Sequence, residues 1–193
     1  MEINIPTSLR EITLGDFQLY MESNQTDEDK LRYILKLTPD TIKAIKRRDF
    51  VELVERIDEL LNEPVEFEQF FTLSGTKYGF IPNLEDMNQA EFMDIDSNIS
   101  DIQTLHTACA VLFRPIIGSV KEKYAVIDYN PTLGFDEVMK HIPLNIALGA
   151  KVFFWNLGKE LAKITPVFLA QEAEEMILTG GKNLASVGDG MAV

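Results

Sequence analysis

The chain has 193 residues, of which 46% are hydrophobic and 25% are charged, a composition typical of a protein that folds around one buried core. Its net charge of −13 disfavours a DNA-coating function, because sequence-independent nucleic-acid binding depends on Lys and Arg side chains that neutralise phosphates. The acidity is concentrated in residues 1–100, which carry a net charge of −11, against −2 for residues 101–193. Such a surface favours solubility and could also steer a basic partner.

We expect a cytoplasmic protein. Its single cysteine, Cys109, lies in an apolar run and cannot form an intramolecular disulfide, which is typical of a reducing compartment. The N-terminus lacks the basic start and apolar middle of a secretory signal, and no run of about 18 uninterrupted apolar residues predicts a membrane span. A membrane partner is therefore not expected.

Two helices are predicted in the first forty residues. Thr13, with an acidic residue three positions later, has the pattern of a capping box and predicts a helix over 14–22. Thr26 precedes three acidic residues that complement the positive end of a helix dipole, and this second helix should end at Pro39.

The next segment changes from helix to strand. A short helix over 40–47 is followed by an amphipathic helix that Asp49 should cap and Pro64 should end. Aromatic and β-branched residues then flank a Ser-Gly turn, and this pattern predicts a β-hairpin insert over about 66–82.

Residues 83–92 repeat the layout of residues 8–17 at an offset of 75. In both segments Leu, an acidic residue, an apolar residue, a capping residue, a second acidic residue and Phe follow in the same order. Asn88 and Glu91 predict a second capping box that starts another helix. The pattern is equally consistent with a duplication and with two independent helix starts.

Further along, Ser100 should cap a core helix that ends before Pro115. Residues 116–130 then predict a second hairpin or an extended arm around a Lys-Glu-Lys turn. A short helix near 134–141 follows.

The longest apolar-periodic segment runs from Pro143 to about Leu178, and Pro166 should kink the helix that it predicts. Its apolar residues cover more than one face, so this helix is either central to the core or packs against another chain. The candidate partner-binding residues on it are Leu148, Val152, Trp155 and Phe168.

The predicted fold class is therefore mainly α (α+β). Residues 1–178 should form a single, mostly helical domain with one or two small β-hairpins and a long kinked C-terminal helix, and residues 179–193 should form a flexible, glycine-rich tail. This architecture suits an assembly or binding protein better than a catalyst.

The residues that could carry chemistry are few. Only two histidines are present, His106 and His141, which limits nucleophilic and zinc-dependent schemes. His106 and Cys109 lie three residues apart on a predicted helix and could touch, but a zinc site needs two further ligands, and a nucleophile needs a pocket and an oxyanion donor. We interpret the pair as helix packing and expect no catalytic residue, metal or cofactor.

Two charged segments have a structural interpretation. Residues 94–101 alternate oxygen-bearing side chains as a calcium loop does, but Ile99 and Leu105 occupy the positions where such a loop needs glycine and a bidentate acid. The only basic cluster adjoins an acidic helix, and internal charge pairing explains it without a nucleic-acid contact. That cluster consists of Lys43, Lys46, Arg47 and Arg48.

Several segments stand out as motifs: YGFIPNLEDM at 78–87, F-x-DID at 92–96 and LHTACAVLFRPI at 105–116, with IPTSL at 5–9 and FFWNLG at 153–158. Together they resemble a family of conserved small proteins of tailed bacteriophages. The likeness spans most of residues 5–170, and it consists of packing and turn motifs that assign no reaction.

The resemblance implies a non-enzymatic phage morphogenesis protein that is similar to tail assembly chaperones. The alternatives are a structural component of the virion, such as a head–tail or tail protein, and a small host-takeover or inhibitor protein. A chaperone of this kind holds assembly-prone tail proteins soluble until they polymerise. The implied partners are phage tail or other virion proteins, or further copies of the chain, in the cytoplasm of the infected bacterial host or in the virion.

Overall fold

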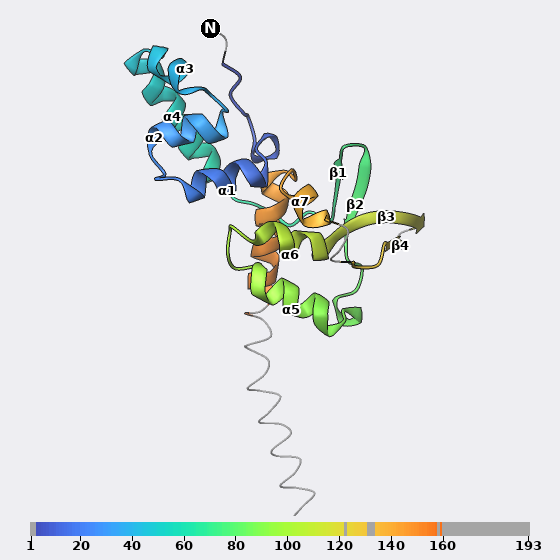
Figure 1. Ribbon diagram of the computed structural model, residues 1–193. Coiled ribbons are helices and arrows are strands. Elements are labelled where there is room, and N and C mark those ends of the chain that lie inside the picture. The colour runs from blue at the N-terminus through green and yellow to red at the C-terminus, as the bar shows by residue number, and fades with distance from the viewer. Residues whose placement is uncertain (1–2, 122, 131–133, 158, 160–193) are drawn as a thin grey trace, which may run out of the picture. The chain divides into compact units, whose positions relative to one another are not determined.

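The computed structural model describes residues 3–121, 123–130, 134–157 and 159. The chain divides into two compact units, residues 1–153 and residues 154–193. The first unit combines helices with a four-stranded antiparallel sheet, which confirms the predicted α+β class (Figure 1).

Helices occupy the N-terminal third of the first unit. They are η1 Leu9–Glu11, α1 Leu14–Glu22, α2 Asp27–Asp29, η2 Lys30–Ile34, α3 Pro39–Ala44 and α4 Arg47–Leu61. The side chains of Thr13, Thr26 and Thr38 cap α1, α2 and α3 by accepting a backbone N–H. The prediction of one helix from Thr26 to Pro39 is wrong. After α2 the chain takes a π turn, η2, and Lys36 adopts a left-handed φ of 55°, a conformation that ends a helix.

The amphipathic helix α4 begins earlier than predicted. It starts at Arg47, and its N-cap Lys46 makes no side-chain capping bond. Asp49, the predicted cap, lies in the first turn instead, where its charge still complements the helix dipole. The helix buries one stripe, formed by Leu53, Val54, Ile57 and Leu60.

Both predicted hairpins are present, and they belong to one sheet of order β1-β2-β3-β4. The strands are β1 Phe70–Leu73, β2 Thr76–Phe80, β3 Phe113–Val120 and β4 Lys123–Val126. Ser74 and Gly75 connect β1 to β2 with φ angles of 48° and 80°, the left-handed geometry of a two-residue hairpin turn. Phe80 pairs with Phe113, so β2 and β3 join two hairpins that are distant in the sequence, which the sequence analysis did not predict.

The repeated segments adopt the same local structure. The pair η1 and α1 is matched, 75 residues later, by η3 Leu84–Asp86 and α5 Gln89–Asn98. Asn88 and Glu91 form the complete capping box that the sequence predicts. The Thr13 hydroxyl accepts the backbone N–H of Asp16 and donates to its carboxylate, so the predicted box at α1 is only half formed.

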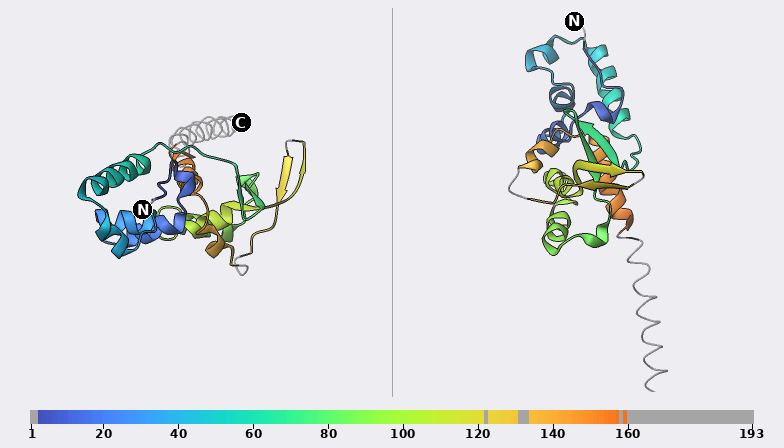
Figure 2. Two further views of the ribbon diagram at one scale, coloured as in Figure 1. Left: turned by 90° about the horizontal axis from the view of Figure 1, so that it is seen from above. Right: turned by 90° about the vertical axis from the view of Figure 1, so that its right-hand side faces the viewer.

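The centre of the core is α6 Leu105–Leu112, which lies beside α5 (Figure 2). It begins well after the predicted cap Ser100 and ends where β3 begins. Its buried residues are Leu105, Ala108, Cys109, Ala110, Val111 and Leu112.

A short helix, α7 Phe135–Met139, precedes a helical segment at residues 144–153. Gly149 lets this segment approach the chain before β1, because a Cβ added there would lie 2.4 Å from the carbonyl oxygen of Glu66. Residues with no exposed surface line the segment: Leu144, Ile146, Ala147 and Ala150.

In the second unit, residues 154–157 and 159 are helical. The remainder of the predicted long helix, its kink at Pro166 and the predicted tail at 179–193 lie outside the described residues.

Candidate protein-binding surface

The far half of the β3–β4 hairpin extends beyond the pairing with β2, and Tyr124 connects it to the first hairpin through contacts with Phe70 and Phe80. Strand β2 pairs only with residues 113–115 of β3, whereas the remainder of β3 pairs with β4 alone. We call residues 116–126 the β-arm. Figures 1 and 2 show it extending away from the helices of the first unit. Within the described chain no third strand pairs with the β-arm, so its two edges present open backbone hydrogen-bonding groups.

Two aliphatic side chains of the β-arm are exposed to an unusual degree. Ile117 is 67% exposed and Val120 is 74% exposed. The pairing register shifts between Ile116 and Gly118, so Ile117 lies at a β-bulge. Exposed apolar side chains on open strands are typical of surfaces to which another polypeptide adds a strand. The sequence analysis missed both residues, although two consecutive isoleucines in a predicted arm were a usable signal.

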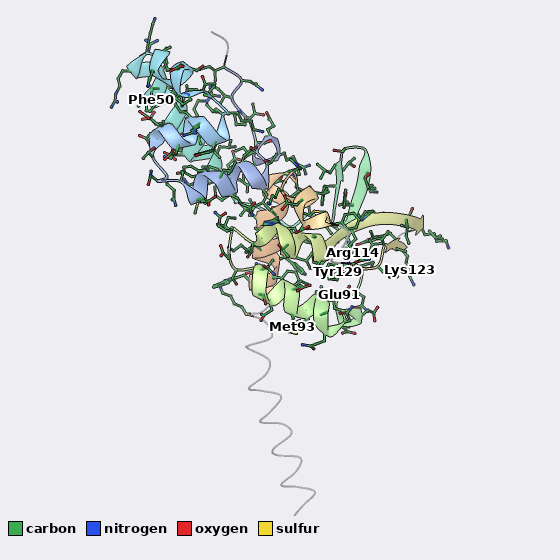
Figure 3. The ribbon with its side chains drawn as sticks, viewed as in Figure 1. Phe50, Glu91, Met93, Arg114, Lys123 and Tyr129 are labelled. Carbon is green, nitrogen blue, oxygen red and sulfur yellow. The ribbon has the colours of Figure 1, made fainter. Side chains whose placement is uncertain are left out.

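A buried ion pair anchors the base of the β-arm to α5. The Arg114 guanidinium donates to the Glu91 carboxylate at 2.5 Å and to the Val111 carbonyl at 2.8 Å. Only 10% and 8% of the two charged side chains are exposed, and the guanidinium lies 5.5 Å from the centre of the Tyr129 ring (Figure 3). Because Glu91 also completes the capping box of α5, one carboxylate both starts the helix and holds the strand.

Tyr129 extends this cluster. Its hydroxyl donates to the Asp94 carboxylate at 2.8 Å. Burial, together with the hydrogen bond and charge of Asp94, raises the pKa of Tyr129 to about 12, so the phenol is protonated at neutral pH. A cavity of about 370 Å³ lies beside Arg114 and Tyr129. Since Glu91 and Arg114 neutralise each other, the cluster is suited to joining elements rather than to proton transfer.

The four residues predicted to bind a partner have different surroundings. In the first unit Leu148 is half-buried and Val152 is 42% exposed. In the second unit Trp155 is 66% exposed, and the Lys159 ammonium lies 5.0 Å from the centre of its ring. Phe168 lies outside the described residues. In the turns before Val152, Leu144, Ile146, Ala147 and Ala150 are fully buried, so much of the apolar perimeter that the sequence shows there belongs to the chain's own core.

The structure does not bring His106 and Cys109 into a common site. Cys109 is fully buried, and burial raises the pKa of its thiol to about 12, which keeps it protonated. This confirms the predicted packing role for Cys109. His106 instead lines a cavity of about 470 Å³, which His141 also lines.

The surroundings of His106 favour a neutral ring. Burial, aided by the charge of Lys140, lowers the pKa of His106. Its Nδ1 lies 3.0 Å from the side-chain nitrogen of Gln18, and an Nδ1 without a proton can accept a hydrogen bond there. The cavity wall also carries two ion pairs of 2.8 Å, Asp16–Lys36 and Glu137–Lys140, and the carboxylate of Glu22.

The basic cluster does not have the internal charge pairing that the sequence predicts. In the part of the chain that the structure describes, Lys43, Lys46 and Arg47 make no ion pair. Arg48 contacts only Asp49, at 3.4 Å, between exposed side chains. Ion pairs of this kind contribute little, because solvent screens them. The cluster is therefore a free basic surface.

Among the described residues, no group of three or more His, Cys, Asp or Glu side chains could hold a metal ion. The suspected calcium segment begins inside α5, which confirms its interpretation as a helix end. Its interpretation as the cap of the next helix is wrong, because Asp101 accepts the backbone N–H of Gln103 in a turn and α6 begins only at Leu105. A search of the same residues found no helix with the length and hydropathy of a membrane span.

No family model, no curated protein and no solved structure matches this chain.

Proposed function

We propose that this protein is a non-enzymatic assembly factor that binds other polypeptides through exposed apolar surface. The β-arm carries the proposal, because Ile117 and Val120 remain 67% and 74% exposed on strands with open edges. Fully burying an aliphatic side chain of this size stabilises a complex by about 1.5–3 kcal/mol, and strand addition supplies main-chain hydrogen bonds as well. Both contributions arise only when another chain covers the β-arm.

Exposed side chains near the C-terminus support the same function. Val152 in the first unit and Trp155 in the second are exposed, and Trp is among the residue types that contribute most at protein interfaces. The helical sequence pattern alone adds two further candidate partner-binding residues, Leu148 of the first unit and Phe168, which lies outside the described residues.

Within this class, the protein is proposed to be a tail assembly chaperone of a tailed bacteriophage that acts in the cytoplasm of the infected host. The resemblance carried by segments such as 78–87 and 105–116 supports this. The net charge of −13 also fits, because it helps to keep a protein with exposed apolar side chains soluble. Its partners would be tail proteins that polymerise after release.

A structural component of the virion is the second candidate. An open-edged β-arm also suits a subunit that remains in a particle, because strand addition can form a permanent interface. Mass spectrometry of purified virions separates the two candidates. Fixed stoichiometry in the particle supports the structural component, and absence from the particle supports the chaperone.

The β-arm itself is tested with the double variant Ile117→Asp/Val120→Asp, co-expressed with the tail proteins of the phage. Both sites are exposed, so the variant should fold, but the yield of soluble tail protein and its co-purification should fall. Leu19→Asp/Val138→Asp is the matched control, because it replaces exposed apolar side chains elsewhere in the first unit. Equal binding and solubilisation by both double variants would exclude the β-arm as the binding surface.

A further inference from the structure

The basic cluster is an exposed, charged surface whose one internal ion pair is the exposed contact between Arg48 and Asp49, among the residues that the structure describes. We call Lys43, Lys46, Arg47 and Arg48 the basic tip. The Arg48 side chain is 91% exposed, and the other three residues are also at the surface. Next to them Val51 is 39% exposed and Phe50 is half-buried (Figure 3). The basic tip therefore combines positive charge with apolar surface.

The helix dipole disfavours positive charge at Lys46, Arg47 and Arg48, at the start of α4, whereas Lys43 lies in the last turn of α3, where a cation is favoured. The helix α4 begins at Arg47. Its N-cap residue, Lys46, has an extended backbone and makes no side-chain capping bond. The N-terminus of a helix carries partial positive charge, so cations in the first turn repel it. A negatively charged partner would offset this repulsion and the repulsion between the four cations.

Negative charge is concentrated around α5. Residues 78–113 contain six acidic residues and no Lys or Arg. Two of the six, Glu91 and Asp94, already contact Arg114 and Tyr129. The four others are exposed: Glu85 and Asp86 precede α5, Asp96 lies on it and Asp101 follows it. Together with the exposed apolar side chains Phe92 and Met93 of α5, we call these residues the acidic face.

The acidic face also has an apolar centre. Phe92 is 53% exposed and Met93 is 57% exposed. Both lie three or four residues from Asp96, so these side chains share one side of the helix. Met93 and Phe50 are labelled in Figure 3, on α5 and α4 respectively.

We propose that the basic tip of one copy of this chain docks on the acidic face of a second copy. The two surfaces are complementary in charge, and each places two apolar side chains beside its charges. Because they are different surfaces of one chain, the contact is head-to-tail, and each copy keeps one surface free for a further copy. This inference goes beyond the proposed function, since neither surface includes the β-arm.

A second copy fits the basic tip better than a nucleic acid does. With a net charge of −13, most of the chain repels phosphates, whereas the acidic face supplies the required counter-charge within the same protein. Repulsion between whole copies is screened beyond about 8 Å at physiological ionic strength, so the local match of the two surfaces decides the contact.

Sedimentation velocity over a range of protein concentrations, at physiological ionic strength, tests the proposal. The wild-type chain should form species larger than the monomer. A tip variant, Lys46→Glu/Arg47→Glu, and a face variant, Phe92→Lys/Met93→Lys, should each weaken this association more than about tenfold, because each places like charges opposite one another. Mixed in equal amounts, the two variants should form a heterodimer and nothing larger, because the tip variant keeps its face and the face variant keeps its tip.

The matched control is Arg32→Glu/Lys77→Glu, which changes the net charge as much as the tip variant does but lies outside the basic tip, the acidic face and the β-arm, and it should associate like the wild type. Circular dichroism checks each fold, and Lys46→Ala/Arg47→Ala replaces a tip variant that does not fold. The proposal is overturned by a monomeric wild type, by association that both variants retain, or by a mixture without heterodimer. It is also overturned if the tip variant keeps self-association but loses binding to a short DNA duplex.

Discussion

The two hairpins of the sheet have similar strands and opposite surroundings. In the β1–β2 hairpin the rings of Phe71, Tyr78 and Phe80 are between 5% and 7% exposed. In the β3–β4 hairpin Ile117 and Val120 are exposed over most of their surface. Hairpin formation is local, because it depends on strand residues and turn geometry, whereas burial depends on what the rest of the chain places above each strand.

The covering of the β1–β2 hairpin comes from distant segments. The Phe153 ring lies 4.5 Å from the Phe67 ring and 5.5 Å from the Phe80 ring, measured between centroids. Phe113, at the start of β3, closes the other side at 5.3 Å from Phe80. Aromatic pairs at these separations add to the stabilisation that burial provides. The β-arm contacts the first hairpin through Tyr124, whose ring lies 4.9 Å from the Phe70 ring and whose hydroxyl donates to the Phe80 carbonyl. Ile117 and Val120 nevertheless remain exposed, which leaves them available to another chain.

The largest expected effect is the loss of Phe113, which is 1% exposed. Phe113→Ala removes contacts to Phe71 and Phe80 and should lower the free energy of unfolding by about 3–5 kcal/mol. Ile117→Ala, four residues along the same strand, should change it by less than about 0.5 kcal/mol. Urea denaturation followed by circular dichroism measures both. Similar losses in the two variants would mean that the β-arm is covered in solution.

Breaking the ion pair between Glu91 and Arg114 should affect the two hairpins to different degrees. Glu91→Gln leaves the buried Arg114 charge without its counter-ion and should cost about 3 kcal/mol. Adding Arg114→Met should recover part of this loss, because no buried charge then remains unpaired. Hydrogen exchange should accelerate in β3 and β4 more than in β1 and β2. Uniform acceleration would show that the ion pair does not hold the base of the β-arm.

A smaller effect is expected at Gly149, which lies against the chain just before the first hairpin. Gly149→Ala would force the helical segment away from Glu66, just before β1, at a cost of about 1–3 kcal/mol. This outweighs the gain of about 1 kcal/mol that alanine has over glycine in a helix. Gly118→Ala is the control on the β-arm, where no atom lies within 4 Å of the added Cβ. Thermal melts should show a lower Tm for the first variant only.

The smallest expected effect is a pH dependence outside both hairpins. Because the pKa of His106 is lower in the folded chain than in the unfolded one, its contribution to stability is present above the unfolded pKa of about 6.5 and is lost as the pH falls through the folded pKa. His106→Gln should flatten this part of the stability curve. NMR titration of the ring gives the folded pKa directly, and a value above 6.5 would contradict the assignment. The difference in side-chain exposure between the two hairpins should stay the same throughout this pH range.

Local patterns in the sequence identified many of the elements correctly. The helix at 14–22, the capping box of Asn88 and Glu91, and the two hairpins each depend on residues within a few positions of one another. The π turn of η2 was not predicted, because the left-handed Lys36 that follows it has no sequence signature. Among the predicted partner-binding residues, Val152 and Trp155 are exposed. The sequence analysis missed the β-arm, and it also missed that the basic tip has little internal charge pairing.

By itself the sequence determined the acidic charge, many of the helix starts, the hairpin turns and the small number of histidines and cysteines, because these follow from composition and short-range spacing. Only the tertiary structure decided that β2 pairs with β3, that Arg114 meets Glu91, and that Cys109 is buried while Ile117 is exposed. These features depend on contacts between residues far apart in the chain, and they are selected by the packing of the whole unit rather than by any single segment.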